Sequence, residues 1–339
     1  MQFTFHVLNN PIQASKVEKF CKLMDSRGHT VYQYDAPYIT NKKEFDFLIS
    51  FGGEKDKEVC LANPELICVQ VGIDYPENYF ALYRSFESRA IYNAYYGLNS
   101  IKQTKQNFYD TVIPDFFNPD DYKFMDKKQD YFLFVGDIQQ HKGVHIAIEA
   151  TQNFGVRLIV AGKGTLADIG YKEVPHHVTE YGVASQEEKI NLLSNAIGTF
   201  VTPLYNEPFS EIQVESLLSG TPTITTDWGC LPEHNIHGKT GYLCNTFEEF
   251  QFATMNIMSG KIKPQDCRDF ALERFTPDVV APKYDDYFER ILDLYKISED
   301  SSHLQPMGWY TNHKSRWEKQ ASNMCINPNP RNEVILEDF

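Results

Sequence analysis

The sequence predicts an α/β protein made of two doubly wound parallel-sheet domains that face a cleft. Apolar strands alternate with amphipathic helices along most of the chain, which is typical of right-handed βαβ units in a parallel sheet. The pattern begins again near residue 131, and 339 residues are more than one hydrophobic core usually organises. Ligands of such sheets bind beyond the carboxyl ends of the strands.

In the first half, "FTFHVLN" (3–9) predicts a strand, and "SKVEKFCKLMDSRG" (15–28) predicts an amphipathic helix that Gly28 closes. Further strands are predicted at 29–34, 45–51, 66–74 and 110–114. The strand "FDFLISF" is apolar nearly throughout, as expected for a parallel strand covered on both faces. An acidic, proline-containing stretch follows, so we place the end of the first domain at residue 125.

The second half repeats this alternation. Strands are predicted at 131–136, 156–162, 198–203 and 222–227, and helices at 142–154 and 185–196. Ser185, with Glu188 three residues later, forms the pattern of a helix capping box. The predicted domains are therefore 1–125 and 126–280, followed by a C-terminal helix and tail over 281–339.

The charge limits the possible partners. The chain carries 32 basic and 46 acidic side chains, a formal net charge of −14. Residues 1–125 hold 13 basic and 16 acidic residues, and the remainder hold 19 and 30. Neither half has the polybasic face typical of binding to nucleic acid or to anionic lipid. We therefore expect no nucleic-acid partner, and the charge does not indicate peripheral membrane association, although it leaves that association open.

The chain also lacks several localisation and metal signals. It has no apolar run of the roughly eighteen residues that cross a membrane, and its start lacks the basic and apolar regions of a secretory signal. Its seven cysteines are scattered and never form a C-x-x-C pair. They predict reduced thiols, with neither a zinc site nor a disulfide framework. Together these features predict a cytoplasmic protein.

The segment "NEPFSEIQVESLL" carries two glutamates, Glu207 and Glu215, eight positions apart. Ser210 and Gln213 form the S-x-x-Q pattern of a capping box, which predicts a helix that starts at Glu211. Unpaired N–H groups at a helix start attract phosphate, and a carboxylate within the helix can accept both hydroxyls of a ribose. The pattern therefore fits a nucleoside diphosphate sugar, although two glutamates at this spacing are by themselves also common in ordinary proteins.

Further motifs follow neighbouring predicted strands: "VGDIQQHKG" (135–143), "AGKG" (161–164) and "WGCLPEHNIHGKTGYL" (228–243). Together with the E-x7-E pattern, their order and spacing resemble the retaining glycosyltransferases of glycosyltransferase family 4, which have the GT-B fold. The resemblance covers roughly residues 130–295. It implies two Rossmann-like domains, a donor nucleotide sugar on the second and an acceptor on the first. It also implies a C-terminal helix that crosses back to the first domain, and no metal or other cofactor.

Carried over residue by residue, the resemblance assigns catalytic roles. Glu207 contacts the donor sugar beside the reacting carbon, Glu215 holds the ribose, and Lys142 neutralises the leaving diphosphate. Such electrostatic stabilisation of a leaving group is the largest contribution expected for this chemistry. Lys142 could instead be an ordinary solvated lysine, but a helix start is an unfavourable place for a cation, which argues for an anionic partner.

The resemblance implies further donor contacts by Gly136, Asp137, Gly162, Lys163, Gly182, Val183, Phe209, Ser210 and Glu211. The last three offer backbone N–H groups to the distal phosphate, and Gly182 and Val183 offer main-chain contacts to the base. Asp137 stands where the family has arginine, and a carboxylate repels a diphosphate. We therefore expect Asp137 to point elsewhere, or a cation such as Lys163 or His141 to compensate.

On the acceptor side, the strand end "VGIDYP" places Asp74 where many family members have a histidine. Asp74 is our candidate for positioning the acceptor, although it could equally just begin a turn. The expected donor is a UDP- or GDP-sugar, and the expected acceptor is a glycan, a glycoprotein or another hydroxyl compound. A nucleotide-sugar epimerase or hydrolase on the same scaffold, and a non-catalytic sugar-nucleotide-binding protein, remain alternatives.

Overall fold

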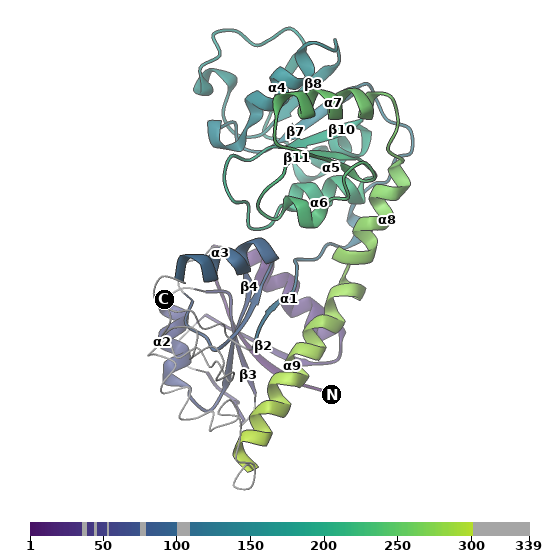
Figure 1. The fold of residues 1–339 in the computed structure, drawn as a ribbon. Helices are drawn as coiled ribbons and strands as arrows, with labels where there is room; N and C mark the ends of the chain where they lie inside the picture. Colours follow the sequence, from purple (N-terminus) through teal and green to yellow (C-terminus); the bar gives the residue numbers. More distant parts are fainter. Residues whose placement is uncertain (36–38, 44–45, 53, 75–78, 100–108, 301–339) are drawn as a thin grey trace, which may run out of the picture. The chain divides into compact units, whose positions relative to one another are not determined.

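The computed structural model describes residues 1–339 except 36–38, 44–45, 53, 75–78, 100–108 and 301–339. The chain divides into two compact units (Figure 1): unit 1 contains Met1–Asp115 and Val280–Phe339, and unit 2 contains Phe116–Val279. These units are defined by contacts and not by independent folding, so the expected domain bounds stay a prediction. Each unit holds a six-stranded sheet, which confirms the predicted fold class of two Rossmann-like domains. The cleft between them stays a prediction.

The strands of unit 1 are β1 (Thr4–Leu8), β2 (Thr30–Tyr34), β3 (Phe47–Ser50), β4 (Ile67–Ile73), β5 (Tyr83–Phe86) and β6 (Asp110–Val112). They lie in the order β2-β1-β3-β4-β5-β6, and every described pair is parallel. The carboxyl ends of the strands therefore share one edge, the carboxyl edge of the sheet. Strands β3 and β4 are buried throughout, which explains their nearly unbroken apolar sequences.

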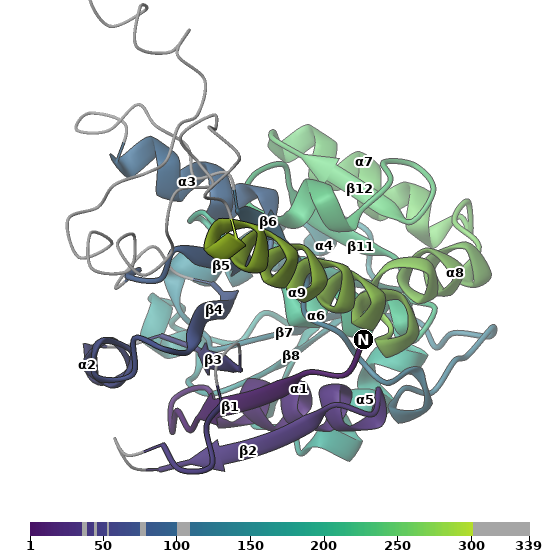
Figure 2. The same ribbon diagram turned by 90° about the horizontal axis from the view of Figure 1, so that it is seen from below.

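Helices cover both faces of this sheet: α1 (Ala14–Ser26), α2 (Glu54–Ala62) and α3 (Arg89–Asn99), together with α9 (Pro277–Asp300). The ring of Phe288 in α9 lies 4.7 Å from that of Phe5 in β1 and 4.9 Å from that of Phe47 in β3. The ring of Tyr284 lies 5.4 Å from that of Phe20 in α1. Helices α1 and α9 thus share one face of the sheet, and α2 covers the other (Figure 2).

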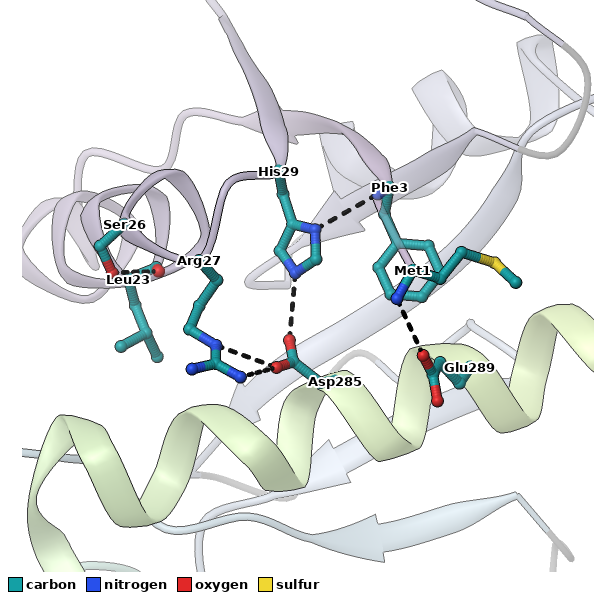
Figure 3. A network of polar contacts seen from close by, with 8 residues as sticks. All are labelled: Met1, Phe3, Leu23, Ser26, Arg27, His29, Asp285 and Glu289. Atoms are coloured by element: carbon teal, nitrogen blue, oxygen red, sulfur yellow. Dashed lines mark hydrogen bonds and ion pairs between the residues drawn. The ribbon is translucent and has the colours of Figure 1, made fainter.

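The return of the C-terminal helix to the first sheet, expected from the family resemblance, is therefore confirmed. Polar contacts reinforce it (Figure 3). Asp285 of α9 accepts hydrogen bonds from Arg27 Nη2 at 2.6 Å and from His29 Nε2 at 3.0 Å. Burial acts to raise the pKa of Asp285, but the bonds from His29 and Arg27 outweigh it and lower this pKa. The predicted tail beyond Asp300 lies outside the described residues.

The strands of unit 2 are β7 (Tyr131–Val135), β8 (Arg157–Ala161), β9 (Val178–Gly182), β10 (Gly198–Val201), β11 (Thr223–Thr226) and β12 (Gly241–Cys244). They lie in the order β12-β11-β10-β7-β8-β9, again with every described pair parallel. The helices are α4 (Val144–Gln152), α5 (Gln186–Asn195), α6 (Glu211–Leu218), α7 (Phe247–Met258) and α8 (Pro264–Phe275). The predicted capping box of Ser185 and Glu188 is present at the start of α5.

Most predicted strands and helices are confirmed, but some elements were missed. Helix α2 has too weak an apolar periodicity to be recognised from its sequence. Strand β12 lies inside a motif that resembled a ligand loop, and its burial comes from parallel pairing with β11. A strand as short as β12 shows too few alternations of apolar and polar residues to be recognised from sequence, so it is identified only by its tertiary contacts.

Candidate functional site

The loop between β10 and α6 carries Glu207 and is fixed by close backbone contacts. Gly229 has φ +63, and a Cβ there would lie 2.7 Å from the nitrogen of Glu207. The next residue, Cys230, donates a backbone hydrogen bond of 2.9 Å to the Glu207 carbonyl. Only glycine allows this approach of the two chains, so the motif "WGC" packs directly against the E-x7-E segment.

Lys142, Tyr205 and Glu207 form one polar cluster. The Tyr205 hydroxyl donates to Oε2 of Glu207 at 2.5 Å, and Lys142 donates to the same hydroxyl. The Lys142 ammonium lies 3.8 Å from Oε2 of Glu207 and 4.9 Å from the centre of the Tyr205 ring. The side chain of Lys142 is 33% exposed and that of Glu207 14%. The structure thus brings together two of the predicted catalytic residues and leaves them partly accessible to a ligand.

Lys142 owes its position to the turn that follows it. It ends the 3₁₀ helix Gln140–Lys142, and Gly143 then adopts φ +73 before α4 begins at Val144. A Cβ on Gly143 would lie 1.8 Å from the Thr202 carbonyl oxygen. The helix predicted over 142–154 therefore starts two residues later than expected, because this left-handed glycine separates the two helices.

Glu215, predicted to hold the ribose, is 4% exposed. Its Oε1 accepts hydrogen bonds from Lys189 Nζ at 2.8 Å and from the Tyr122 hydroxyl at 3.1 Å. Burial raises the pKa of Glu215, and Lys189 only partly opposes this effect. Burial and the nearby Glu215 carboxylate raise the pKa of Tyr122. A buried carboxylate with two fixed donors is a rigid acceptor, as recognition of a diol requires.

The start of α6 partly contradicts the sequence prediction. The helix does begin at Glu211, but the side chain of Ser210 makes no capping hydrogen bond. Gln213 instead donates to the Leu231 carbonyl at 3.2 Å. The predicted capping box is therefore wrong, because the packing of the 229–231 loop competes for Gln213. Burial raises the pKa of the Cys230 thiol well above its ordinary value, while the Ser210 N–H donates toward this sulfur and acts in the opposite direction.

The side chain and the backbone of Phe209 have different surroundings. Its side chain is buried, stacks against Phe117 at 6.3 Å and contacts the His234 ring at 4.6 Å. The side chain thus belongs to the core, so only the backbone of Phe209 could meet a phosphate. Burial also lowers the pKa of His234 to about 3, so this ring is neutral within the core.

The glycines predicted to lie near the diphosphate and base do meet at the sheet edge. Gly136 donates its N–H to the Ala161 carbonyl at 2.9 Å, and Gly162 donates to the Gly182 carbonyl at 2.8 Å. A Cβ on Gly162 would lie 1.8 Å from the Gly136 carbonyl oxygen, so a side chain there would clash. Val183, just beyond Gly182, is 75% exposed. These residues lie at the carboxyl ends of β7, β8 and β9.

Asp137 and Lys163 lie on adjacent loops. Ile138 donates its N–H to the Lys163 carbonyl at 2.8 Å, which joins the loops after β7 and β8. Both side chains are exposed. The backbones of the two loops are therefore adjacent, and compensation of the Asp137 charge by Lys163 stays a prediction. The ring of His141 packs 5.6 Å from that of Tyr205.

Asp74 lies in unit 1, at the end of β4. Lys16 Nζ contacts its Oδ2 at 2.9 Å and also contacts Oε1 of Glu87 at 2.6 Å. Gln13 donates to Asp74 at 3.4 Å. Asp74 is therefore part of a charged cluster at the carboxyl edge of the first sheet. Because the two units are described separately, its grouping with Glu207 and Lys142 stays a prediction.

Sequence reasoning missed Tyr205, Lys189 and Tyr122. None of the three belongs to a recognisable sequence motif. Each is identified only by its hydrogen bond to Glu207 or Glu215. For Tyr205 a signal existed, since it stands two residues before Glu207. Among the residues that the structure describes, no group of three or more His, Cys, Asp or Glu side chains could hold a metal ion. In that same part of the chain, no helix is long and apolar enough to span a membrane.

Comparison with known proteins bears on this geometry. Residues 120–274 match the family model described as "Glycosyl transferases group 1". The chain is 34% identical over 122 residues to glycogen synthase of Mycobacterium tuberculosis, covering 33% of this chain and 29% of that protein. It is 31% identical over 117 residues to the D-rhamnosyltransferase WbpZ of Pseudomonas aeruginosa, covering 33% of this chain and 31% of that protein. The chain thus spans about a third of the length of these curated relatives.

Solved structures share the fold over a larger part of the chain. AviGT4, described as a glycosyltransferase involved in avilamycin A biosynthesis, superposes with a TM-score of 0.67 at 18% identity. That match covers 86% of this chain and 98% of AviGT4. The Anabaena protein HepE, solved in complex with UDP and glucose, gives a TM-score of 0.61 at 16% identity, covering 85% of this chain and all of HepE.

The two six-stranded parallel sheets and the structural matches show the GT-B fold. The resemblance to the group 1 glycosyltransferases is confirmed, and the matching residues 120–274 contain the whole E-x7-E segment.

Proposed function

We propose that the protein is a retaining glycosyltransferase that transfers a sugar from a nucleoside diphosphate sugar to a hydroxyl acceptor without a metal ion. One observation carries this proposal: the Lys142–Tyr205–Glu207 cluster lies within the matched family segment, in the same sheet unit as the buried Glu215. In this proposal Lys142 supplies a cation for the diphosphate, and Glu207 a partly exposed carboxylate for the sugar. Glu215 supplies a rigid carboxylate that accepts hydrogen bonds from the ribose hydroxyls.

In the proposed reaction, the acceptor hydroxyl oxygen bonds to the anomeric carbon on the face that the diphosphate leaves. The bond between the anomeric carbon and the phosphate oxygen breaks, and the hydroxyl proton passes to the leaving phosphate. Lys142 and the N–H groups at the start of α6 stabilise the charge on that phosphate. Glu207, held by Tyr205, accepts hydrogen bonds from the hydroxyls of the donor sugar.

We propose a UDP- or GDP-sugar as the donor. HepE was solved in complex with UDP and glucose, and also with UDP-glucose, which supports uracil as the first base to test. We propose a glycan or glycoprotein as the acceptor and a cytoplasmic location. The described cysteines are free and buried, as expected where the surroundings keep thiols reduced.

The first experiment is a thermal-shift panel of UDP, GDP, ADP and dTDP with their common sugars, run in EDTA. A ligand at 100 times its Kd stabilises the folded state by about 2.7 kcal/mol. We expect one nucleotide to raise the melting temperature of the wild type and of Glu187→Ala, an exposed glutamate on α5. Glu215→Ala should lose this response.

Turnover of the selected donor then tests the reaction. Release of nucleoside diphosphate with a retained α-anomer in the product, seen by NMR, supports transfer. An inverted anomer contradicts the retaining mechanism, and conversion of the donor without any acceptor supports an epimerase or hydrolase. If no nucleotide stabilises the wild type, the donor proposal is wrong.

A further inference from the structure

Unit 1 contains a cavity of about 720 Å³ on the α2 face of the sheet. Asn9 follows β1, Asp35 follows β2, and Asp56 and Asn63 come from α2 and its end. The cavity therefore opens at the carboxyl ends of β1 and β2, where parallel sheets bind ligands. Its volume lies within the range of small-molecule sites.

The polar groups of this cavity are held in place by hydrogen bonds. Asn9 Nδ2 donates to Asp35 Oδ1 at 2.7 Å, and the Tyr34 hydroxyl donates to the Thr40 carbonyl at 2.7 Å. Lys42 donates to the Asn63 side chain at 2.6 Å. Asp35 and Asn9 each keep further hydrogen-bonding capacity, because a carboxylate can accept several bonds and an amide has two donors and an acceptor. The site is thus organised before a ligand arrives.

Apolar side chains complete the lining. Leu8, Ile39 and Val59 border the same space and are each less than 9% exposed. Planar carboxylate and amide groups beside apolar surface match a pyranose, which has hydroxyls at its edge and C–H groups on its faces.

The charges of the cavity disfavour an anionic ligand. Three carboxylates line it, those of Asp35, Asp56 and Glu58, against two ammonium groups. One of these, Lys42, already forms an ion pair with the Glu65 carboxylate at 2.5 Å. A phosphorylated or carboxylated ligand would meet net negative charge, whereas a neutral saccharide would not.

We propose that this cavity binds an uncharged saccharide of one or two rings. Its identification as the acceptor site rests on the proposed function, which requires a hydroxyl acceptor. The saccharide then contacts Asp35 and Asn9 through its hydroxyls and Ile39 and Val59 through a ring face. Asp74 does not line this cavity and contacts Lys16 and Gln13 of the α1 region, so in this proposal Asp35 and Asn9 hold the acceptor in place of Asp74.

The test is saturation-transfer NMR on the full chain without donor. The probes are maltose, cellobiose, α-1,3-mannobiose and N,N′-diacetylchitobiose, with glucose 6-phosphate as an anionic probe. We expect a saturable signal from at least one neutral disaccharide and a weaker one from glucose 6-phosphate. Ala62→Phe should fill the cavity from an exposed position of α2 and lower the affinity for the disaccharide by about tenfold or more. Leu61→Phe is the matched control, because Leu61 is 47% exposed and does not line the cavity.

A second pair of variants guards against misfolding of Ala62→Phe. Asp35→Ala removes a lining carboxylate, and Asp25→Ala removes an exposed carboxylate of α1 outside the cavity. Saccharide affinity that falls only in Asp35→Ala supports the proposal. Equal affinity in all variants, tighter binding of glucose 6-phosphate, or no saturable neutral disaccharide overturns it. Nucleotide-induced thermal shifts in the same samples separate this outcome from failure of the donor site in unit 2.

Discussion

The Tyr205 hydroxyl donates a hydrogen bond of 2.5 Å to the Glu207 carboxylate from only two residues away in the chain. Lys142 contacts the same hydroxyl, so the tyrosine links the cation to the carboxylate. This arrangement gives Glu207 a fixed orientation in a loop that has no helical support. Tyr205 is therefore a positioning residue for the proposed donor-sugar contact.

Tyr205→Phe keeps the ring and removes only this hydroxyl. We expect kcat for transfer to fall by about tenfold to a hundredfold, because a misplaced catalytic contact is costly. The affinity for the nucleotide alone should change by less than about threefold. Tyr181→Phe, at a 41% exposed position of the same unit, should retain wild-type kcat. An equal kcat in both variants would refute the positioning role.

The position of the buried Glu215 predicts that the protein distinguishes ribonucleotides from 2′-deoxyribonucleotides. We expect the wild type to bind UDP roughly tenfold to a hundredfold more tightly than 2′-deoxy-UDP, because a lost hydrogen bond to a charged acceptor costs about 1.5–3 kcal/mol. Glu215→Gln should bind the two nucleotides with similar affinity, as measured by calorimetry. Glu187→Gln on the exposed face of α5 serves as control. If Glu215→Gln still binds UDP more tightly than 2′-deoxy-UDP, another side chain must bind the ribose hydroxyl.

Glu87 predicts a pH dependence of the stability of unit 1. Burial raises its pKa to about 8, with Lys16 opposing this shift and Asp115 and Asp74 adding to it. A carboxyl whose pKa is higher in the folded state stabilises the fold below its unfolded pKa, and this contribution is lost as the pH rises toward 8. Urea midpoints should therefore fall between about pH 5 and pH 8.

Glu87→Gln should flatten this dependence, because the amide does not titrate. Glu58→Gln, at an exposed position of α2, should keep the wild-type slope. The midpoints are read by circular dichroism at several pH values. A slope that is unchanged in Glu87→Gln would show that another group controls it.

Phe288 tests how much α9 contributes to unit 1. Its ring is fully buried against β1 and β3, so Phe288→Ala should lower the free energy of unfolding by about 3–5 kcal/mol. Phe252→Ala, at a 53% exposed position of α7, should cost far less. Hydrogen exchange of the β1 and β3 peptides reports the local effect. Unchanged exchange in Phe288→Ala would mean that α9 does not stabilise this sheet.

Alanine variants of Gly143 and Gly155 distinguish the cost of a steric clash from the cost of backbone strain. Both have positive φ, but a Cβ on Gly143 would lie 1.8 Å from the Thr202 oxygen, whereas nothing lies within 4 Å of one on Gly155. Gly155→Ala should cost about 1–2 kcal/mol of strain. Gly143→Ala should cost about 1–3 kcal/mol more and reduce transfer, because it displaces Lys142. Equal urea midpoints for the two variants would contradict the close packing of Gly143 on Thr202.

The sequence by itself determined the two parallel sheets, because burial on both faces imposes apolar runs such as that of β3. It also determined the capping box of Ser185, which depends on residues close together in the chain. The start of α6 at Glu211 was predicted correctly, although the capping box on which that prediction rested is absent. The resemblance located Glu207 and Glu215, since their spacing is local.

Only the tertiary structure decided which side chains meet these carboxylates. Lys189 comes from another helix and Tyr122 from a segment before β7, and no local spacing joins either to Glu215. The same holds for Gln213, which contacts the Leu231 carbonyl instead of capping its own helix. Capping follows local geometry, but the partner of a buried polar group is set by the neighbours that tertiary packing brings to it, and most buried polar groups are hydrogen-bonded.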